Sequence, residues 1–343
     1  MEKMNALVFE KPDGIDALAF REVDYPKPAA GEVVVKVEAS ALNHRDVWIT
    51  QGLYAGIKTP IILGSDGAGT VYELGENVPE NWLHKPVLIN PSLNWGDNPR
   101  AQQKKFRILG LPDNGVQAEF VCVPVENIVQ KPDYLSFAEA AAIPLAGLTG
   151  YRALFTQGNL QAGQTVLITG IGGGVASLML LMAVAAGANV LVTSGNEEKI
   201  ERAKSAGAIG GANYRSDDWA EKISAAAGEN GVDLIIDSAG GEGFDNLLNI
   251  VNPGGKIVFF GATAGNPPGI NLRKIFWKQV TVQGTTMGTQ TDFSEMVHFF
   301  EKHHIHPLVD GPFDWQDYPE AFRRMASGEQ FGKIVVRHDV SGS

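Results

Sequence analysis

The chain has 343 residues, of which 44% are hydrophobic and 20% are charged, which is typical of a globular protein large enough for two domains. Its formal net charge of −11 argues against a nucleic-acid surface, and its single cysteine excludes an internal disulfide and a multi-cysteine zinc cluster. The sequence opens without an apolar signal segment and contains no apolar run long enough to span a bilayer. We therefore expect a cytoplasmic protein that has no membrane partner.

The first third of the sequence predicts a β-rich region, because short apolar or alternating runs are separated there by glycine and proline. The expected strands are Met4–Phe9, Ala19–Val23, Val33–Ala39, Gly67–Leu74 and Glu119–Pro124. Cys122 lies in the last of them and is predicted to be a small buried hydrophobe. Residues 92–116 are polar and rich in turn formers, so we expect a long surface loop there.

From about Ser136 the pattern changes to alternating strands and helices. Ser136 and Glu139 have the spacing of a capping box in front of an alanine-rich helix. Further strands are expected at Val166–Thr169, Asn189–Thr193, Ala208–Asn213, Val232–Asp237, Ile257–Phe260 and Thr281–Gly284, and helices at Ser177–Ala186, Glu197–Ala206, Trp219–Ala227, Gly243–Val251, Phe293–His303 and Tyr318–Ser327. This order predicts an α/β fold with a doubly wound parallel sheet over residues 129–285. A last strand, Lys333–Arg337, is expected to return to the β-rich domain, which then comprises residues 1–128 and 286–343.

The glycine-rich stretch after Val166–Thr169 is the most informative segment of the sequence. Glycines 170, 172, 173 and 174 precede Val175 and a long apolar helix, in the pattern Gly-x-Gly-x-x-Val-Ala. Glycines let a backbone approach a pyrophosphate, and a helix N-terminus offers free N–H donors to it. Because the strand Asn189–Thr193 completes a βαβ unit, the segment predicts a dinucleotide site that includes Gly170, Gly172, Gly173, Gly174 and Val175.

The residues that close the second strand of this unit favour NADPH over NADH. NAD sites usually place an acidic residue about 20 residues beyond the glycines, where this chain has Ser194. Ser194 leaves room for a 2′-phosphate and can donate a hydrogen bond to it. Lys199 and Arg202 can neutralise the phosphate, and Tyr214 can close over it. The alternative is that the two basic residues are ordinary solvated charges of a helix.

Five landmarks agree in order and spacing with one family, and together they cover nearly the whole chain. They are residues 31–37, 63–69, 145–151, 254–258 and 331–335. The chain thus resembles the medium-chain dehydrogenase/reductase superfamily. This resemblance implies a GroES-like catalytic domain, which is the β-rich part, and a Rossmann NADP(H)-binding domain.

The departures from this family are also informative. Zinc alcohol dehydrogenases of the superfamily bind the catalytic metal with Cys, His and Cys, and this chain has Asn43, Ser65 and Leu145 at those positions. These residues cannot replace a set of thiolates and imidazole. The structural-zinc lobe corresponds to residues 92–110, which contain no cysteine. With Asn43 at the first of these positions, the chain resembles the zinc-free quinone oxidoreductase branch of the superfamily. That branch reduces quinones and α,β-unsaturated carbonyl compounds with NADPH.

The resemblance implies zinc-independent hydride transfer from NADPH to a small quinone or enone substrate. Asn43 is the first choice for the donor that stabilises the charge growing on the substrate oxygen, and the alternative is a structural turn asparagine. Tyr54 is a candidate substrate-lining hydroxyl. Arg45 and Asp46 are expected to pair with each other or to lie behind the substrate, and neither is assigned to catalysis. The other implied cofactor contacts are Thr149, Ser238, Phe260 and Gly261, and no metal is expected.

Two other functions stay open, and one partner is implied. The chain could be a reversible alcohol dehydrogenase, which would need a Lewis acid, or a non-catalytic NADPH-binding protein like the lens crystallins of the family. In the resembled family the last strand of the sheet, here near residues 279–284, pairs across a two-fold axis into a homodimer. Phe276 and Trp277 could add apolar area to that interface or belong to the core. His303, His304 and His306 are expected to be exposed at a helix end, and residues 341–343 to be disordered.

Overall fold

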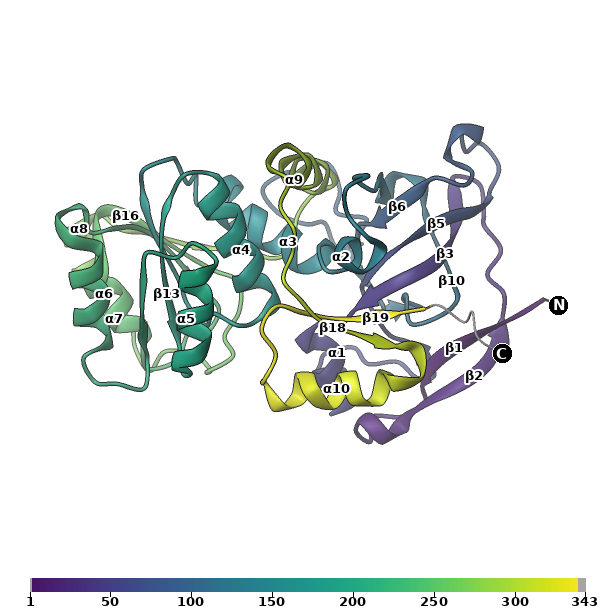
Figure 1. Ribbon diagram of the computed structural model, residues 1–343, viewed down its shortest axis with the longest axis horizontal. Coiled ribbons are helices and arrows are strands. Elements are labelled where there is room, and N and C mark those ends of the chain that lie inside the picture. The colour runs from purple at the N-terminus through teal and green to yellow at the C-terminus, as the bar shows by residue number, and fades with distance from the viewer. Residues whose placement is uncertain (1, 339–343) are drawn as a thin grey trace. The chain divides into compact units, whose positions relative to one another are not determined.

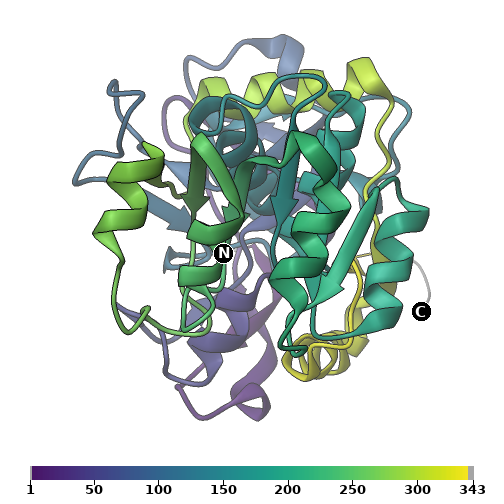
Figure 2. The same ribbon diagram turned by 90° about the vertical axis from the view of Figure 1, so that its left-hand side faces the viewer.

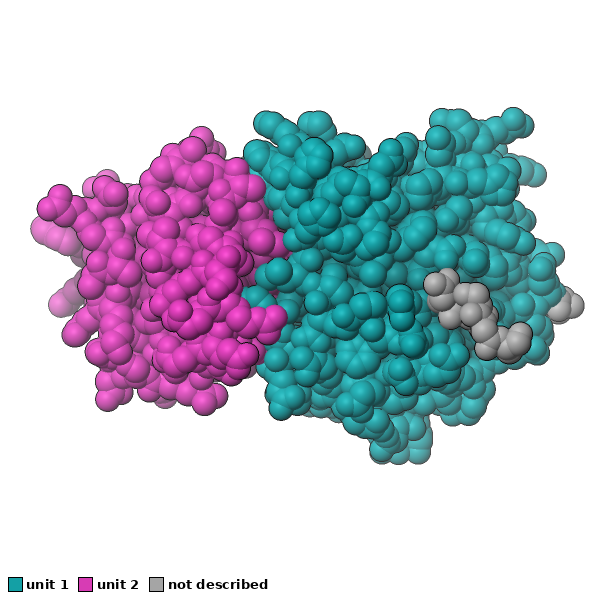
Figure 3. All heavy atoms as spheres, viewed as in Figure 1, with its two compact units in different colours: residues 1–146, 288–343 teal, residues 147–287 magenta. Residues whose placement is uncertain are grey.

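The computed structural model describes residues 2–338, which form two compact units (Figure 3). Unit 1 contains the chain up to Ala146 and from Gly288 onward, and unit 2 contains Gly147–Met287. Residues 129–146 lie with unit 1, because β11 (Ile128–Gln130) pairs with β6 (Pro86–Ile89) and α2 (Phe137–Ala141) packs on the strands of that unit. The tail expected at residues 341–343 lies outside the described residues.

Unit 1 is built on a seven-stranded sheet in the order β11-β6-β5-β3-β19-β18, with β10 also paired to β3. The long central strand β3 is antiparallel to β5, β10 and β19. The pairing of Val335 in β19 with Ala41 in β3 confirms that the last strand returns to the β-rich unit. The bounds are β3 Glu32–Ala41, β5 Asp66–Leu74, β10 Phe120–Pro124, β18 Val309–Asp314 and β19 Lys333–Arg337.

A smaller sheet and several helices complete unit 1. β1 (Lys3–Phe9) pairs with β2 (Leu18–Asp24) and β4 (Ile61–Ile62). α10 (Tyr318–Ser327) lies along β18 and β19 (Figure 1) and buries Phe322 against Phe9, Leu42 and Ile334. The remaining helices of unit 1 are α1 (His44–Thr50) and α9 (Gln290–His303), and α1 was not predicted from the sequence. The helix α3 (Pro144–Tyr151) contains the boundary between the two units.

The expectation of a surface loop over residues 92–116 is wrong in part. This segment forms a three-stranded sheet of β7 (Ser92–Leu93), β8 (Arg107–Leu109) and β9 (Pro112–Asp113). Apolar side chains scattered among the polar ones, including Trp95, are buried and hold it to unit 1. Cys122 is half-buried, and its Sγ donates to Glu32 Oε2 at 3.3 Å. Burial raises the pKa of this thiol to about 12.

A buried polar cluster lies where the end of the described chain meets β3 and α10. His338 Nε2 is 2.8 Å from Ser40 Oγ and 3.1 Å from the Tyr318 hydroxyl, and the two hydroxyls also hydrogen-bond to each other. His338 Nδ1 faces the Ala118 carbonyl at 3.2 Å, so Nδ1 carries the proton and Nε2 accepts. Burial lowers the pKa of His338 from 6.5 to about 3, so the imidazole is neutral in the folded protein.

We expect His338 to make stability fall in mild acid. The unfolded chain binds a proton at this histidine between its ordinary pKa of 6.5 and the folded value of about 3, so stability is complete above that range and is lost as the pH falls through it. The loss is about 2 kcal/mol from about pH 7.5 to about pH 5. The pKa of buried Asp46, raised to about 6, acts in the opposite direction. Urea unfolding of the wild type and of His338→Gln across this pH range measures the contribution of the histidine to the free energy of unfolding. Equal slopes of this free energy against pH in the two proteins would contradict the assignment.

Unit 2 is a doubly wound parallel sheet of six strands in the order β14-β13-β12-β15-β16-β17. α6 and α7 lie on one side of the sheet and α4 and α5 on the other (Figure 1), and Figure 2 shows helices in front of the strands. The strands are β12 Thr165–Ile168, β13 Asn189–Ser194, β14 Gly210–Asn213, β15 Val232–Asp237, β16 Val251–Phe259 and β17 Thr281–Gly284. The helices are α4 Gly174–Ala185, α5 Glu197–Ser205, α6 Trp219–Ala227, α7 Phe244–Ile250 and α8 Leu272–Lys278.

The sheet of unit 2 confirms the predicted strand–helix alternation. Its central strands are continuous runs of buried apolar residues, as expected when both faces are covered. α8 was not predicted, because its residues Leu272–Lys278 show no one-sided apolar pattern and none of them is buried. Among the described residues no helix has the length and apolar character needed to cross a membrane.

Candidate active site and dinucleotide site

The glycine-rich turn of unit 2 joins β12 to α4. Gly170 and Gly172 have φ of +68° and +118°, which side chains other than hydrogen rarely allow. Gly173 is the N-cap of α4 and offers no capping side chain, so the backbone N–H groups of the first turn, at Gly174 and Val175, have no side-chain cap. A Cβ on Gly172 would lie 2.6 Å from Lys199 Cδ and 3.1 Å from its Nζ. The turn therefore combines uncapped N–H donors, a helix N-terminus and an ammonium group, which suits a pyrophosphate.

Lys199 reaches the turn because of how α5 begins. Asn196 is the N-cap, and its Oδ1 accepts hydrogen bonds from the backbone N–H groups of Glu198 and Lys199. This cap fixes the first turn of α5, and the half-buried Lys199 side chain then extends to Gly172. Arg202, one turn further along, is exposed. The structure thus brings together Gly172 and Lys199, which the sequence analysis assigned to the same ligand.

The end of β13 carries the residues predicted to select the dinucleotide. Ser194 is buried, and its Oγ donates to the Ile171 carbonyl at 3.3 Å and accepts from Asn196 N at 3.3 Å. Gly195 follows, and a Cβ there would lie 2.7 Å from the Tyr214 hydroxyl and 2.9 Å from Arg215 Nε. No acidic side chain stands at this strand end. Arg215 thus brings a positive charge beside Gly195, which was not predicted from the sequence.

The other predicted cofactor contacts lie near the ends of β15 and β16. Buried Asp237 accepts from Thr169 Oγ1 at 2.7 Å and from Gly240 N at 2.8 Å, which shapes the turn at Ser238. The backbone of Gly261 passes so close that a Cβ would be 2.9 Å from the Ser238 carbonyl oxygen. Phe260, just before it, donates its N–H to the Asp237 carbonyl at 3.2 Å. The structure therefore places Ser238, Phe260 and Gly261 together.

Thr149 lies in α3, apart from the loops just described. Its side chain is buried, with Oγ1 4.0 Å from Met287 Sδ. The neighbouring Gly150 lets α3 approach α4 closely, because a Cβ there would lie 2.7 Å from Met179 Cγ and 3.7 Å from a methyl carbon of Val175. The close approach of the two helices is thus made by Gly150, the residue next to Thr149.

In unit 1 the predicted residue Asn43 belongs to a fully buried hydrogen-bond network around Asp66. Asn43 Nδ2 donates to Asp66 Oδ2 at 2.9 Å, and Asn43 Oδ1 accepts from Lys333 Nζ at 2.8 Å. Lys333 Nζ also lies 2.7 Å from Asp66 Oδ2 and 2.8 Å from the Leu42 carbonyl. The second carboxylate oxygen, Oδ1, accepts from Leu145 N at 2.6 Å. The network joins α1, β5, β19 and α3, and it holds the Asn43 amide in one orientation.

Arg45 lies next to this network, and of the two alternatives expected for Arg45 and Asp46 the first is not seen, since among the described residues they form no ion pair. Its Nη1 donates to Ser65 Oγ at 2.6 Å and to the Leu109 carbonyl at 3.0 Å. Asp46 instead accepts from Asn43 N at 2.8 Å at the start of α1. The helix points the two side chains in different directions because adjacent residues do not face each other on a helix. Burial raises the pKa of Asp46 to about 6 despite the nearby Arg45 charge.

Tyr54, the second residue predicted to be catalytic, is half-buried. It packs against the core of unit 1, and the Arg45 guanidinium lies over its ring, 5.1 Å from the centroid. The chain on either side of Tyr54 is exposed, with Leu53 73% accessible. Tyr54 is therefore a covering side chain on an exposed loop, in direct contact with the buried cation.

Comparison with known proteins bears on this arrangement. A family model described as alcohol dehydrogenase GroES-like domain matches residues 29–133, and one described as zinc-binding dehydrogenase matches residues 174–302. The zinc-type alcohol dehydrogenase-like protein YogA of Leptosphaeria maculans is 36% identical over 93% of this chain and 94% of its own length. The chain belongs to the medium-chain dehydrogenase/reductase superfamily.

Other members of this superfamily extend the likeness. The crystal structure of an NAD-dependent alcohol dehydrogenase has a TM-score of 0.92 and 31% identity, covering 98% of this chain and 100% of that chain. An acryloyl-coenzyme A reductase of Sulfurisphaera tokodaii is 28% identical over 97% of this chain and 100% of its own length. The family models and the solved structure thus agree that this chain has a GroES-like domain and a Rossmann domain.

A catalytic zinc, which many members of the superfamily are named for, does not fit the residues present. Asn43 is held by Asp66 and Lys333, Ser65 Oγ donates to the Leu109 carbonyl at 2.7 Å, and the side chain of Leu145 has no donor atom. The ammonium of Lys333 already compensates the charge of the Asp66 carboxylate. Within residues 2–338 no three His, Cys, Asp or Glu side chains form a group that could hold a metal ion.

The histidines near the end of α9 have other roles. His304 is the left-handed C-cap of that helix, with φ of +49°. His306 Nδ1 lies 2.6 Å from Glu139 Oε1, and hydrogen bonds from His306 and Ser136 hold the pKa of Glu139 below its usual value in spite of partial burial. His303, half-buried, packs on the ring of Phe299.

Proposed function

We propose that the protein is an NADPH-dependent oxidoreductase that transfers hydride to quinones or to α,β-unsaturated carbonyl compounds without zinc. The observation that carries the proposal is the substitution of the metal-ligand set by the neutral residues Asn43, Ser65 and Leu145. Zinc acts in alcohol chemistry as a Lewis acid that stabilises an alkoxide. An enone or a quinone spreads the incoming charge over a conjugated system, so hydrogen-bond donors can stabilise it.

The dinucleotide site supports the cofactor half of this proposal. The glycine turn would hold the pyrophosphate with Lys199 beside it, instead of the role at the 2′-phosphate expected from the sequence, and Ser194, Tyr214 and Arg215 would surround the adenosine ribose. When bound, the reduced dinucleotide supplies the hydride. Unit 1 supplies the groups that meet the substrate, and among them Asn43 is proposed as a donor, since its amide donates without titrating.

The named relatives support two related activities. Acryloyl-coenzyme A reductases reduce an α,β-unsaturated acyl group, which is the substrate chemistry proposed here. Other relatives are named NAD-dependent alcohol dehydrogenases, and these names favour reversible carbonyl reduction as the second candidate. The two candidates differ in their need for a metal.

The first test is oxidation of NADPH by a simple para-quinone and by but-3-en-2-one, after exhaustive dialysis against a chelator. We expect rapid oxidation that added zinc does not increase. Asn43→Ala is expected to lower kcat by about 100-fold, as for loss of one oxyanion donor, with an unchanged Kd for NADPH. Activity that is abolished by the chelator and restored by zinc would establish the alcohol dehydrogenase alternative. NADPH binding without turnover of any acceptor would favour a non-catalytic role.

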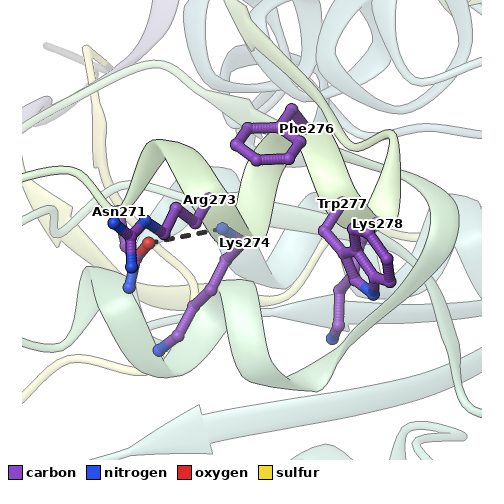
Figure 4. A pocket seen from close by; sticks show the side chains of 6 residues that line it. All are labelled: Asn271, Arg273, Lys274, Phe276, Trp277 and Lys278. Carbon is purple, nitrogen blue, oxygen red and sulfur yellow. Dashed lines mark hydrogen bonds between the residues drawn. The ribbon is translucent and has the colours of Figure 1, made fainter.

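We also propose that two copies of the chain pair through the edge of the unit 2 sheet. β17 is the last strand of that sheet, so the hydrogen-bonding groups along its outer side have no partner strand within the described chain. The adjacent α8 exposes Trp277 by 82% and Phe276 by 65%, beside a shallow groove (Figure 4). An edge strand flanked by exposed aromatic residues suits an isologous dimer with a two-fold axis.

We expect Trp277→Glu to shift sedimentation velocity from dimer to monomer at micromolar concentration. Burial of a charge in an apolar interface costs several kcal/mol, which exceeds what the lost contacts alone would cost. The matched control is Ile209→Glu, because Ile209 is an exposed apolar residue near β14 at the opposite edge of the same sheet. A wild type that sediments as a monomer would overturn this proposal.

A further inference from the structure

Arg45 carries a buried positive charge for which the structure shows no carboxylate partner. The residue is 93% buried, and within residues 2–338 it forms no ion pair. Asp66 is engaged by Lys333, and Asp46 Oδ2 accepts from the start of α1, so the Arg45 charge acts on the Asp46 carboxylate without a direct bond to it. A guanidinium removed from water without a direct ion pair is costly, and buried charges of this kind are found preferentially at functional sites.

The hydrogen bonds of Arg45 leave one edge of the guanidinium available. Nη1 is saturated by the Ser65 hydroxyl and the Leu109 carbonyl, whereas Nη2 makes only a long bond of 3.4 Å to the Leu111 carbonyl. Nε is buried and has no partner. Nε–H and one N–H of Nη2 lie parallel on the same side of the planar group, which is the geometry that receives an anionic oxygen or a carboxylate.

The position of this charge connects it to the reaction. Ser65, which Arg45 contacts, and Asn43 and Leu145, which Asp66 joins, are the residues aligned with the three metal ligands of zinc-dependent members. Arg45 therefore contacts one of these three positions directly, and Asp66 joins the other two. Tyr54, on its exposed loop, covers the guanidinium from one side.

We propose that Arg45 binds the carbonyl oxygen of the acceptor and stabilises the negative charge that develops on it. The inference rests on the proposed function. Hydride adds to the β-carbon of the enone and forms a C–H bond, the C=C π pair becomes the new double bond between the α-carbon and the carbonyl carbon, and the carbonyl π pair moves onto the oxygen, which gives an enolate. The substrate is reduced and the dinucleotide oxidised, and a proton from solvent then adds to the α-carbon. Arg45 is thus a catalytic residue that donates a hydrogen bond to the enolate oxygen.

Arg45→Met removes the charge at nearly constant length, and Arg45→Lys keeps the charge but loses the planar edge. With but-3-en-2-one and NADPH, we expect kcat/KM to fall about 100- to 1,000-fold in Arg45→Met and less in Arg45→Lys, with an unchanged Kd for NADPH. The control is Arg324→Met, in the same unit, which breaks the ion pair with Asp310. It should change stability but leave kcat/KM unaltered. An Arg45→Met enzyme with wild-type kcat/KM would overturn the proposal.

Two further readouts separate a chemical role from a structural one. Ethylguanidine should restore turnover at least about 10-fold in Arg45→Ala and have no effect on Arg324→Ala, because only the former leaves a hole at the reacting group. Titration calorimetry with butanoate, a carboxylate with two oxygens for the free edge, should show binding to the wild type that Arg45→Met lacks. If the wild type reduces no acceptor, the proposed function fails, and the butanoate titration alone decides: equal heats in wild type and Arg45→Met overturn the anion site.

Discussion

Replacement of Lys333 by methionine is expected to destabilise unit 1 by about 3–5 kcal/mol, because it strands a buried carboxylate. Lys333 and Asp66 are 2% and 0% exposed, and their charged groups are 2.7 Å apart. In Lys333→Met, Asp66 would keep its bonds to Asn43 and Leu145 but lose the only cation that pairs with it in the described chain. The Leu42 carbonyl and Asn43 Oδ1 would each lose a donor as well.

Urea unfolding followed by tryptophan fluorescence measures this effect, since Trp48, Trp82, Trp95 and Trp315 lie in unit 1. Lys131→Met is the matched control. Lys131 is also buried, but it donates only to the carbonyls of Pro132 and Leu135, so its removal strands no charge and should cost less. The double variant Lys333→Met/Asp66→Asn should be more stable than the sum of its single variants predicts. An additive result would show that the two charges do not stabilise each other.

Replacement of Ser194 by aspartate is expected to reverse the dinucleotide preference. A carboxylate at the end of β13 would repel a 2′-phosphate and accept hydrogen bonds from free ribose hydroxyls, as in NAD-binding members of the fold. We expect the Kd for NADPH to rise about 100-fold, as for loss of one or two charge-assisted hydrogen bonds, while the Kd for NADH falls. Arg215→Ala should weaken NADPH and leave NADH unchanged, because Arg215 Nε lies beside Gly195 at the same strand end.

Fluorescence titration of NADPH and NADH into the wild type and into Ser194→Asp gives the four dissociation constants directly. Ser205→Asp is the control, since it adds the same charge at the exposed far end of α5. Its effect on NADPH binding should be small, because the charge is solvated and screened. Wild-type dissociation constants that are equal for NADH and NADPH would contradict the assignment of NADPH. Such a result would bring the chain closer to its relatives that are named NAD-dependent.

Much of the architecture could be predicted from the sequence because it depends on local patterns. The buried parallel strands read as continuous apolar runs, and the capping box at Ser136 and Glu139 marked the start of α2 correctly. The turn before α4 could also be predicted, because the positive φ values at Gly170 and Gly172 require glycine. Composition misled the analysis at residues 92–116, where polar residues concealed the buried Trp95 and three short strands.

The chemistry of unit 1 was decided by tertiary structure alone. Arg45 and Asp46 are adjacent in the sequence, yet their hydrogen bonds go to different partners, Ser65 and Leu109 for Arg45 and the start of α1 for Asp46. The partner of Asp66 is Lys333, 267 residues further along the chain. No local signal indicates such a contact, because it exists only once β19 pairs with β3 and β5 pairs beside them. The sequence by itself determined the fold and the dinucleotide turn, because these depend on local patterns, whereas long-range strand pairing decided that Lys333 compensates the buried charge of Asp66.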